Sequence, residues 1–180
     1  RAGLGAVALG DEAILRFRDF QLDGRHMRVV RQAVNRIERA GYTAKVRRHA
    51  EIPEDEMDSA ISDADRWRDT DNERGFSMAL GRLGDPLDGR CVLVEAFDSE
   101  GNREALLSFS PWGEKGLSLD LMRRSRDSDN GVMEFMVASL VAAGPSIGAD
   151  KVSLNFAVRR GIFAEGERIG AGPIIRATRG

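Results

Sequence analysis

The sequence contains few cysteines and no apolar segment long enough to cross a membrane. Cys91 is the one cysteine, so no disulfide can form within the chain, and a reducing compartment such as the cytosol is expected. The longest apolar stretch of helical character, residues 132–143, is interrupted by Glu134 and is too short for a bilayer, and no signal peptide is visible. We therefore expect a soluble chain that reaches any membrane through segments outside it.

The sequence is also poor in the side chains used for metal binding and covalent catalysis. Its two histidines, His26 and His49, both lie in a basic stretch, and neither has a visible nucleophile partner. A catalytic triad or a zinc site is therefore not expected. Residues 161–172 are rich in glycine, but they lack the lysine of a phosphate-binding loop, and no dinucleotide-binding fingerprint follows a strand. We expect neither a metal nor a cofactor.

The composition is that of a folded protein with unevenly distributed charge. Hydrophobic residues make up 42% and charged residues 31% of the chain, and 180 residues suffice for one domain, or one domain and part of another. The net charge of −2 hides two blocks of opposite sign. Residues 24–48 hold eight Lys or Arg against one acid, whereas residues 51–73 hold ten acids against two arginines. This asymmetry predicts surfaces with separate electrostatic roles.

The basic block predicts an amphipathic helix over residues 25–40, preceded by a turn at Asp23 and Gly24 and ended by Gly41. One side is apolar, with Met27, Val30, Ala33, Val34 and Ile37. Four arginines fall within about 80° of one another on the other side, and we call them the arginine ridge: Arg25, Arg28, Arg36 and Arg39. The ridge either contacts phosphates of a nucleic acid or of anionic lipid head groups, or is a solvated helix face.

The remaining pattern predicts an α/β (α+β) fold. A strand is expected at residues 13–17, and a second helix is expected at residues 53–67, where Pro53 and three acids form a typical first turn. An antiparallel meander is expected from strands at residues 76–80, 91–97, 104–109 and 116–122. A polar loop (123–130), a helix (131–143) and a strand (151–158) follow. This is the order of the acetyltransferase-like fold, a mostly antiparallel mixed sheet flanked by helices, with a boundary between two units near Ala50.

Candidate site residues gather around the strand at 116–122. Period-two alternation places Leu117, Leu119 and Leu121 on one face and Ser118, Asp120 and Met122 on the other. Arg123, Arg124 and Arg126 follow, and the loop leads to a helix whose first residues, Asn130 and Gly131, expose backbone N–H groups. Such a junction suits a phosphate or the oxyanion of an acyl transfer. Alternatively, Asp120 pairs with a nearby arginine and the loop is only solvated.

Two further points concern this site. Residues 153–157 alternate in the same way, so Asn155 either adds an amide to the pocket from a neighbouring strand or lies on an exposed strand face. On an ideal strand the side chains of Asp120 and Arg123 would point to opposite faces, that is, they have opposite parity. Both can therefore serve one pocket only if the strand ends or bulges near Met122.

Three short motifs occur in order along the chain: Gly75-Phe76-Ser77-Met78, then Ser-Leu-Asp-Leu-Met-Arg at residues 118–123, then Asn-Gly-Val-Met-Glu at residues 130–134. In this order and with these gaps they resemble the catalytic domain of the aminoacyl-phosphatidylglycerol synthases, also called multiple peptide resistance factors. The arginine-rich residues 27–41 resemble the helix that links the two acetyltransferase-like halves in that family. Together with residues 159–176 they are most similar to the actinobacterial members, in which a lysyl-tRNA synthetase is fused in the same polypeptide.

The resemblance covers essentially the whole chain and implies two tandem acetyltransferase-like units. Residues 1–49 would be the end of the first unit with a basic linker helix, and residues 50–180 a second unit that lacks its C-terminal end. The resemblance also implies transfer of lysine from lysyl-tRNA, the donor substrate, to phosphatidylglycerol at the cytoplasmic face of the plasma membrane. Residues 154–158 depart from the family's usual Leu-Gly-x-Ala-Pro pattern, which alters the expected pocket there.

By the same resemblance, Asp120 and Arg123 match functional positions. We expect Asp120 to hold the amino group of the lysyl moiety or to assist proton movement from the attacking hydroxyl, and Arg123 to contact a phosphate or the developing oxyanion. The expected substrate-binding residues are Phe76, Ser118, Met122, Arg124, Asn130, Gly131 and Asn155. Two alternatives stay open: an acetyl-coenzyme A-dependent N-acetyltransferase whose loop at 123–131 holds a pyrophosphate, and a non-catalytic module that binds tRNA or anionic lipid through the arginine ridge.

Overall fold

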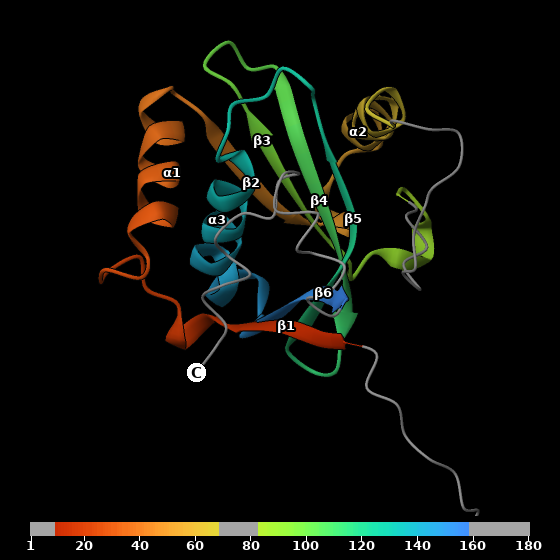
Figure 1. Ribbon diagram of the computed structural model, residues 1–180. Coiled ribbons are helices and arrows are strands. Elements are labelled where there is room, and N and C mark those ends of the chain that lie inside the picture. Colours follow the sequence, from red (N-terminus) through yellow and green to blue (C-terminus); the bar gives the residue numbers. More distant parts are fainter. Residues whose placement is uncertain (1–9, 69–82, 159–180) are drawn as a thin grey trace, which may run out of the picture.

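The computed structural model describes residues 10–68 and 83–158, and these form a six-stranded sheet with helices on both faces (Figure 1). The strands are β1 (Gly10–Arg16), β2 (Thr43–Arg48), β3 (Val92–Phe97), β4 (Arg103–Trp112), β5 (Gly116–Arg124) and β6 (Lys151–Val158). The α-helices are α1 (Arg28–Arg39), α2 (Glu54–Arg66) and α3 (Val132–Ile147). Short 3-10 helices follow β1 and β2 and precede β3: η1 (Phe17–Asp19), η2 (His49–Glu51) and η3 (Pro86–Asp88).

The strand order across the sheet is β1-β6-β5-β4-β3-β2. Neighbouring strands are antiparallel except β5 and β6, which run parallel because α3 carries the chain back across the sheet between them. The expected class, a mostly antiparallel mixed sheet flanked by helices, is confirmed. No helix within the described ranges has both the length and the apolar character needed to cross a bilayer.

The sheet separates two hydrophobic clusters. The larger one lies under α1 and α3, where Val30, Val34 and Ile37 of α1 meet apolar side chains of α3 and of the sheet. The smaller one lies under α2, where Met57 and Ala60 pack near Leu93 and Leu106 of the central strands. Figure 1 shows α1 and α3 together on one side of the sheet and α2 on the other.

Several predicted elements are confirmed, with changed limits. The first helix is terminated by Gly41 as predicted, and Gly41 has a φ of 84°. The helix begins at Arg28, so Arg25 precedes it and the helical-wheel position predicted for Arg25 does not apply. The strand β5 continues to Arg124, so the loop predicted from residue 123 starts later. The helix α3 continues to Ile147, past Pro145, whose missing N–H removes one i→i−4 hydrogen bond in the last turn.

One strand was missed, and one expected strand cannot be compared. The prediction contained no strand at Thr43–Arg48, yet β2 pairs with β3 from Thr43 opposite Phe97 to Arg48 opposite Val92. The strand expected at 76–80 lies outside the described residues. Because β2 and β3 belong to one sheet, the described elements on both sides of Ala50 are continuous. The division of the chain into units 1–49 and 50–180 stays a prediction.

Candidate active site

The central feature of the candidate site is a β-bulge at Asp120. Leu119 lies opposite Phe109 and Leu121 lies opposite Ser108, which leaves Asp120 as an extra residue in β5. Leu119 packs against the cluster under α1 and α3, whereas Leu121 belongs to the cluster under α2. The prediction that Leu117, Leu119 and Leu121 share one face is therefore wrong for Leu121, because the bulge reverses the alternation.

The bulge also changes the relation between Asp120 and Arg123. Arg123 lies opposite Leu106, a residue of the cluster under α2, so Arg123 is on the α2 face of the sheet. Asp120 acts electrostatically on the buried His49, which contacts Ser108 on that same face. The bulge required by the parity argument is thus present, at Asp120 instead of Met122. It brings the two predicted catalytic residues to one face of the sheet.

His49 and Ser108 form a buried polar pair beside Asp120. His49 is 7% exposed and Ser108 is 1% exposed, and His49 Nε2 lies 3.3 Å from Ser108 Oγ. Burial lowers the pKa of His49, and the nearby carboxylates of Asp88 and Asp120 oppose this effect. The imidazole is therefore neutral near pH 7. Its Nδ1 is buried and has no hydrogen-bond partner among the described residues.

His49 does contact a serine hydroxyl, which the sequence does not reveal. Ser108 is 59 positions away in the sequence, so no local pattern could have revealed the contact. However, the Ser108 hydroxyl is too deeply buried to attack a substrate. The pair instead buries a neutral imidazole within electrostatic range of the carboxylate of Asp120.

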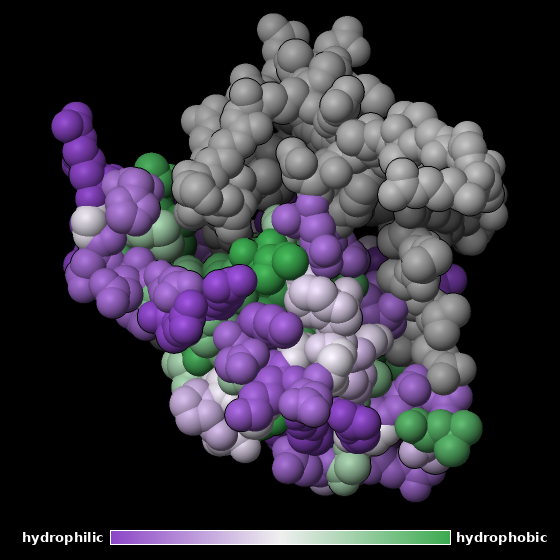
Figure 2. Space-filling view, turned by 90° about the horizontal axis from the view of Figure 1, so that it is seen from below, coloured by the Kyte–Doolittle hydropathy of each residue, from purple (hydrophilic) through white to green (hydrophobic). Residues whose placement is uncertain are grey.

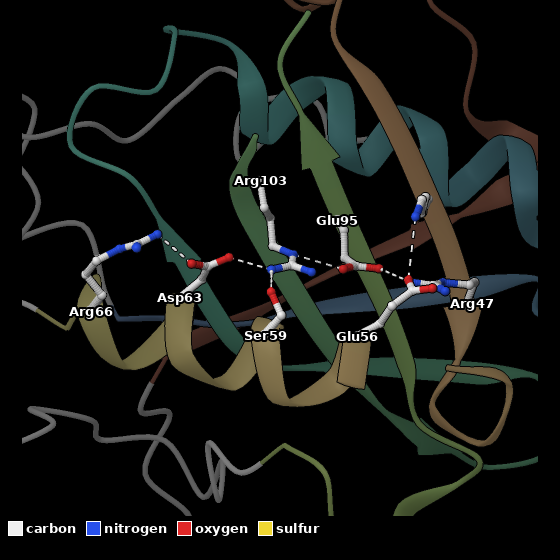
Figure 3. A network of polar contacts seen from close by, with 8 residues as sticks. Arg47, Glu56, Ser59, Asp63, Arg66, Glu95 and Arg103 are labelled. Atoms are coloured by element: carbon white, nitrogen blue, oxygen red, sulfur yellow. Dashed lines mark hydrogen bonds and ion pairs between the residues drawn. The ribbon is translucent and has the colours of Figure 1, made fainter. Parts of the chain in front are cut away.

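A network of charged side chains attaches α2 to this face of the sheet (Figure 3). Glu95 of β3 is fully buried, and it accepts hydrogen bonds from Arg47 Nη2 at 2.7 Å and Arg103 Nε at 3.0 Å. Arg103 also contacts Asp63 and donates to Ser59 of α2. Arg47 contacts Glu56 of α2 at 2.8 Å. The sequence does not reveal this network, because its members come from β2, β3, β4 and α2 and its contacts join residues up to 48 positions apart in the chain.

Asn155 has a structural task at the point where β5 and β6 separate. The two parallel strands pair only from Gly116 opposite Lys151 to Ser118 opposite Ser153. Beyond that, Asn155 adopts a φ of 71°, and its Nδ2 donates to the Leu119 carbonyl at 2.6 Å. Asn155 does lie on the neighbouring strand, as predicted, but its amide nitrogen binds backbone. Substrate binding by Ser118, which is half-buried, and by Asn155 stays a prediction.

The junction before α3 is packed against α1. Arg36 donates a hydrogen bond to the Asn130 carbonyl, and a Cβ on Gly131, whose φ is 107°, would lie 3.0 Å from Cβ of Ala33. Burial raises the pKa of Glu104, and the carboxylates of Asp98, Asp127 and Asp129 raise it further. Substrate binding by Asn130 and Gly131 stays a prediction.

The remaining predicted site residues lie at several different places in the chain and the structure. Met122 is 53% exposed, and Arg124 is exposed at the end of β5. All four members of the arginine ridge, Arg25, Arg28, Arg36 and Arg39, are exposed. Phe76 lies outside the described residues. Within residues 10–68 and 83–158, no group of His, Cys, Asp or Glu is arranged to hold a metal ion.

Comparison with known proteins gives a consistent result. Residues 1–180 match the family described as "Phosphatidylglycerol lysyltransferase, C-terminal". The chain is 59% identical over 179 residues to the "Lysylphosphatidylglycerol biosynthesis bifunctional protein LysX" of Rhodococcus opacus, and 58% identical to the protein of the same name from Mycobacterium tuberculosis H37Rv. These alignments cover 99% of the chain but only 16% and 15% of the two relatives, so the chain spans about a sixth of their length.

Solved structures lead to the same group. The C-terminal domain of a protein described as a lysylphosphatidylglycerol synthetase from Agrobacterium fabrum superposes with a TM-score of 0.72 at 28% identity, over 93% of this chain and 54% of that one. The L-PGS structure from Bacillus licheniformis superposes with a TM-score of 0.69 at 25% identity, over 91% of this chain and 53% of that one.

Proposed function

The chain belongs to the family of phosphatidylglycerol lysyltransferase C-terminal domains, and from this premise we propose that it transfers lysine from lysyl-tRNA to phosphatidylglycerol at the cytoplasmic face of the membrane. The names of the relatives support lysylphosphatidylglycerol as the product. Those relatives are named as bifunctional proteins, which supports a lysyl-tRNA synthetase in the same polypeptide as the source of the donor.

The proposed reaction exchanges one ester for another. The free hydroxyl oxygen of the phosphatidylglycerol head group attacks the lysyl carbonyl carbon, and the bond from that carbon to the tRNA ribose oxygen breaks. The proton of the attacking hydroxyl is transferred to the ribose oxygen. The reaction equation is then balanced without an oxidant, a metal or a cofactor. The protein must mainly orient the two substrates and stabilise the tetrahedral oxyanion.

The bulge in β5 is the observation that carries this proposal. It places Asp120 and Arg123 on the α2 face, where a carboxylate and a guanidinium can act on the same acyl group. We propose that Asp120 receives the hydroxyl proton or holds the lysyl ammonium, and that Arg123 binds a phosphate or the oxyanion.

The test uses the full-length protein, labelled lysyl-tRNA and phosphatidylglycerol vesicles, followed by lipid extraction. Asp120→Asn is expected to lower lysyl transfer about a hundredfold, the scale for a positioned catalytic group. Asp127→Asn, which removes an exposed acid from the following loop, is the matched control and should retain transfer. Normal transfer by a folded Asp120→Asn protein would remove Asp120 from the site.

Two further comparisons complete this experiment. Alanyl-tRNA as donor tests the choice of lysine, and equal rates with lysyl-tRNA would contradict it. If Asp120 holds the side-chain ammonium, Asp120→Asn should slow lysyl transfer more than alanyl transfer, whereas loss of a proton acceptor should slow both equally. Retained tRNA binding with no transfer to any lipid would instead favour a non-catalytic binding module.

A further inference from the structure

A row of aromatic and basic side chains crosses four strands at one end of the sheet. Trp112 of β4 lies opposite Gly116 of β5, Gly116 lies opposite Lys151 of β6, and Lys151 lies opposite Arg16 of β1. We call Trp112, Lys151 and Arg16 the Trp-Lys-Arg row. This end of the sheet is at the bottom of Figure 1, and Figure 2 shows that the surface seen from there is mainly hydrophilic.

The middle of the row is built around a residue without a side chain. The Lys151 ammonium lies 4.8 Å from the centre of the Trp112 ring, a cation–π contact. A Cβ on Gly116 would lie 3.0 Å from Cε of Lys151 and 3.0 Å from the Trp112 ring. Glycine at this position therefore allows the indole and the ammonium to meet across β5. Trp112 remains 36% exposed.

The arrangement of charges in the row does not stabilise the sheet. Arg16 and Lys151 are directly opposite in the register, and like charges in such positions destabilise a sheet. They line an open depression together with Arg18 and one acid, Asp150. Arg18 is also paired with the exposed Asp19 at 3.2 Å. An anion in the depression would relieve the repulsion between Arg16 and Lys151.

We propose that the Trp-Lys-Arg row binds the phosphate of an anionic phospholipid at the membrane surface. Cations near such a surface are attracted to its negative potential, and indole rings prefer the boundary between head groups and acyl chains. Nucleic-acid phosphates would satisfy the cations, but a base could stack on Trp112 only at the ring face that the Lys151 ammonium does not occupy. The row therefore fits a lipid surface better than tRNA.

This site is separate from the proposed reaction centre and rests on the proposed function only for its lipid substrate. Leu15 and Val152 face the cluster under α1 and α3, so their neighbours Arg16 and Lys151 face the α2 side, as Asp120 does. Gly116 precedes Asp120 by four residues in β5, a distance of about 13 Å. That distance exceeds the reach of one three-carbon head group. The lipid bound by the row is consequently a neighbour of the acceptor lipid.

The binding test uses the 180-residue chain and vesicles of phosphatidylglycerol or of phosphatidylcholine at low salt. Replacing both Arg16 and Lys151 by Gln should weaken binding to phosphatidylglycerol vesicles about thirtyfold, and binding to phosphatidylcholine should be weak throughout. The matched control is Arg66→Gln with Arg68→Gln, which removes the same charge from the end of α2. Lys151→Arg should retain binding because it keeps the cation.

A fluorescence measurement tests the indole directly. Trp67 and Trp112 are the two tryptophans, so Trp67→Phe leaves Trp112 as the sole reporter. Its emission should shift to shorter wavelength with phosphatidylglycerol vesicles and stay unchanged with phosphatidylcholine vesicles. Trp112→Ala should weaken vesicle binding while circular dichroism stays native.

Three outcomes would overturn the proposal: no binding of the wild-type chain to phosphatidylglycerol vesicles, unchanged binding by the double Gln variant, or loss of tRNA binding in place of vesicle binding. The proposed function is tested separately. In the full-length protein, row variants should retain transfer to phosphatidylglycerol dispersed in detergent micelles, whereas Asp120→Asn should lose it. Absence of transfer in the wild-type protein would contradict the proposed function and leave the vesicle result standing.

Discussion

Replacement of Glu95 by glutamine tests whether the charged network holds α2 on the sheet. The side chain of Glu95 is fully buried between Arg47 and Arg103, the latter only 7% exposed. Glutamine keeps the shape of the side chain but removes its charge. It also turns an N–H₂ group toward one of the two guanidinium groups. The repulsion between the guanidinium groups of Arg47 and Arg103 would then be offset by less negative charge.

The expected loss of stability depends on the burial of Glu95 and on the partners that Arg47 and Arg103 keep. Removing one member of a buried ion pair costs about 3–5 kcal/mol, because the remaining charge is left in a poorly solvated place. Arg103 keeps Asp63 and Ser59, and Arg47 keeps Glu56. We therefore expect the lower end, a loss of about 3 kcal/mol in the free energy of unfolding. This is a large part of the roughly 5–15 kcal/mol that stabilises a typical domain.

Urea unfolding followed by circular dichroism measures this loss as a shift in midpoint at constant slope. Glu56→Gln is the control, because Glu56 contacts Arg47 from the surface and is 37% exposed. Its effect should be much smaller and should shrink with added salt, whereas the effect of Glu95→Gln should persist. A loss below about 1 kcal/mol in natively folded Glu95→Gln protein, the value of a surface pair, would refute the structural role of the network.

Four more predictions concern pH and the arginine ridge. Burial lowers the pKa of His49, so the unfolded state binds the proton more readily than the folded state. The free energy of unfolding should therefore fall as pH drops through the ordinary value of 6.5. In urea titrations, His49→Gln should flatten this dependence. Burial raises the pKa of Glu104, so stability should fall as pH rises from the ordinary value of 4.5 through the raised one, and a Glu104→Gln variant that keeps this slope would contradict the assignment. Arg28→Glu with Arg39→Glu should weaken tRNA binding and flatten its salt dependence if the ridge binds phosphates, whereas unchanged binding would identify a solvated face. Arg36→Glu should instead lower thermal stability, because Arg36 joins α1 to the loop before α3.

The elements that the sequence predicted are those whose signals are local. α2 follows from Pro53 and a first turn of acids, and α1 follows from its apolar stripe and Gly41. The strand β2 was missed because its cations made it look like part of the basic block. Lys45 and Arg47 point toward Glu56 of α2, so their charges are explained by a helix that comes later in the chain.

The residues of the candidate site stay a prediction, and their geometry could be predicted only in part. The alternation around Asp120 predicted the strand, and parity showed that Asp120 and Arg123 could share a pocket only if the strand ended or bulged between them. The position of the bulge depends on pairing with Ser108 and Phe109 in β4, which the sequence of β5 does not contain. The contact of His49 with Ser108 and the positive φ of Asn155 likewise depend on tertiary packing.

The pairing of β1 with β6 has a consequence for synthesis on the ribosome. Lys151 leaves the ribosome about 135 residues after its partner Arg16, which at roughly 5–20 residues per second takes on the order of ten seconds. During that time β1 has no strand partner among the described residues, since β6 is its only neighbour in the sheet. The three antiparallel strands β3, β4 and β5 can pair as soon as they emerge. Closure of the sheet by β1 must therefore be among the last steps of folding, and slowing translation before residue 151 would lengthen the exposure of this strand to chaperones and proteases.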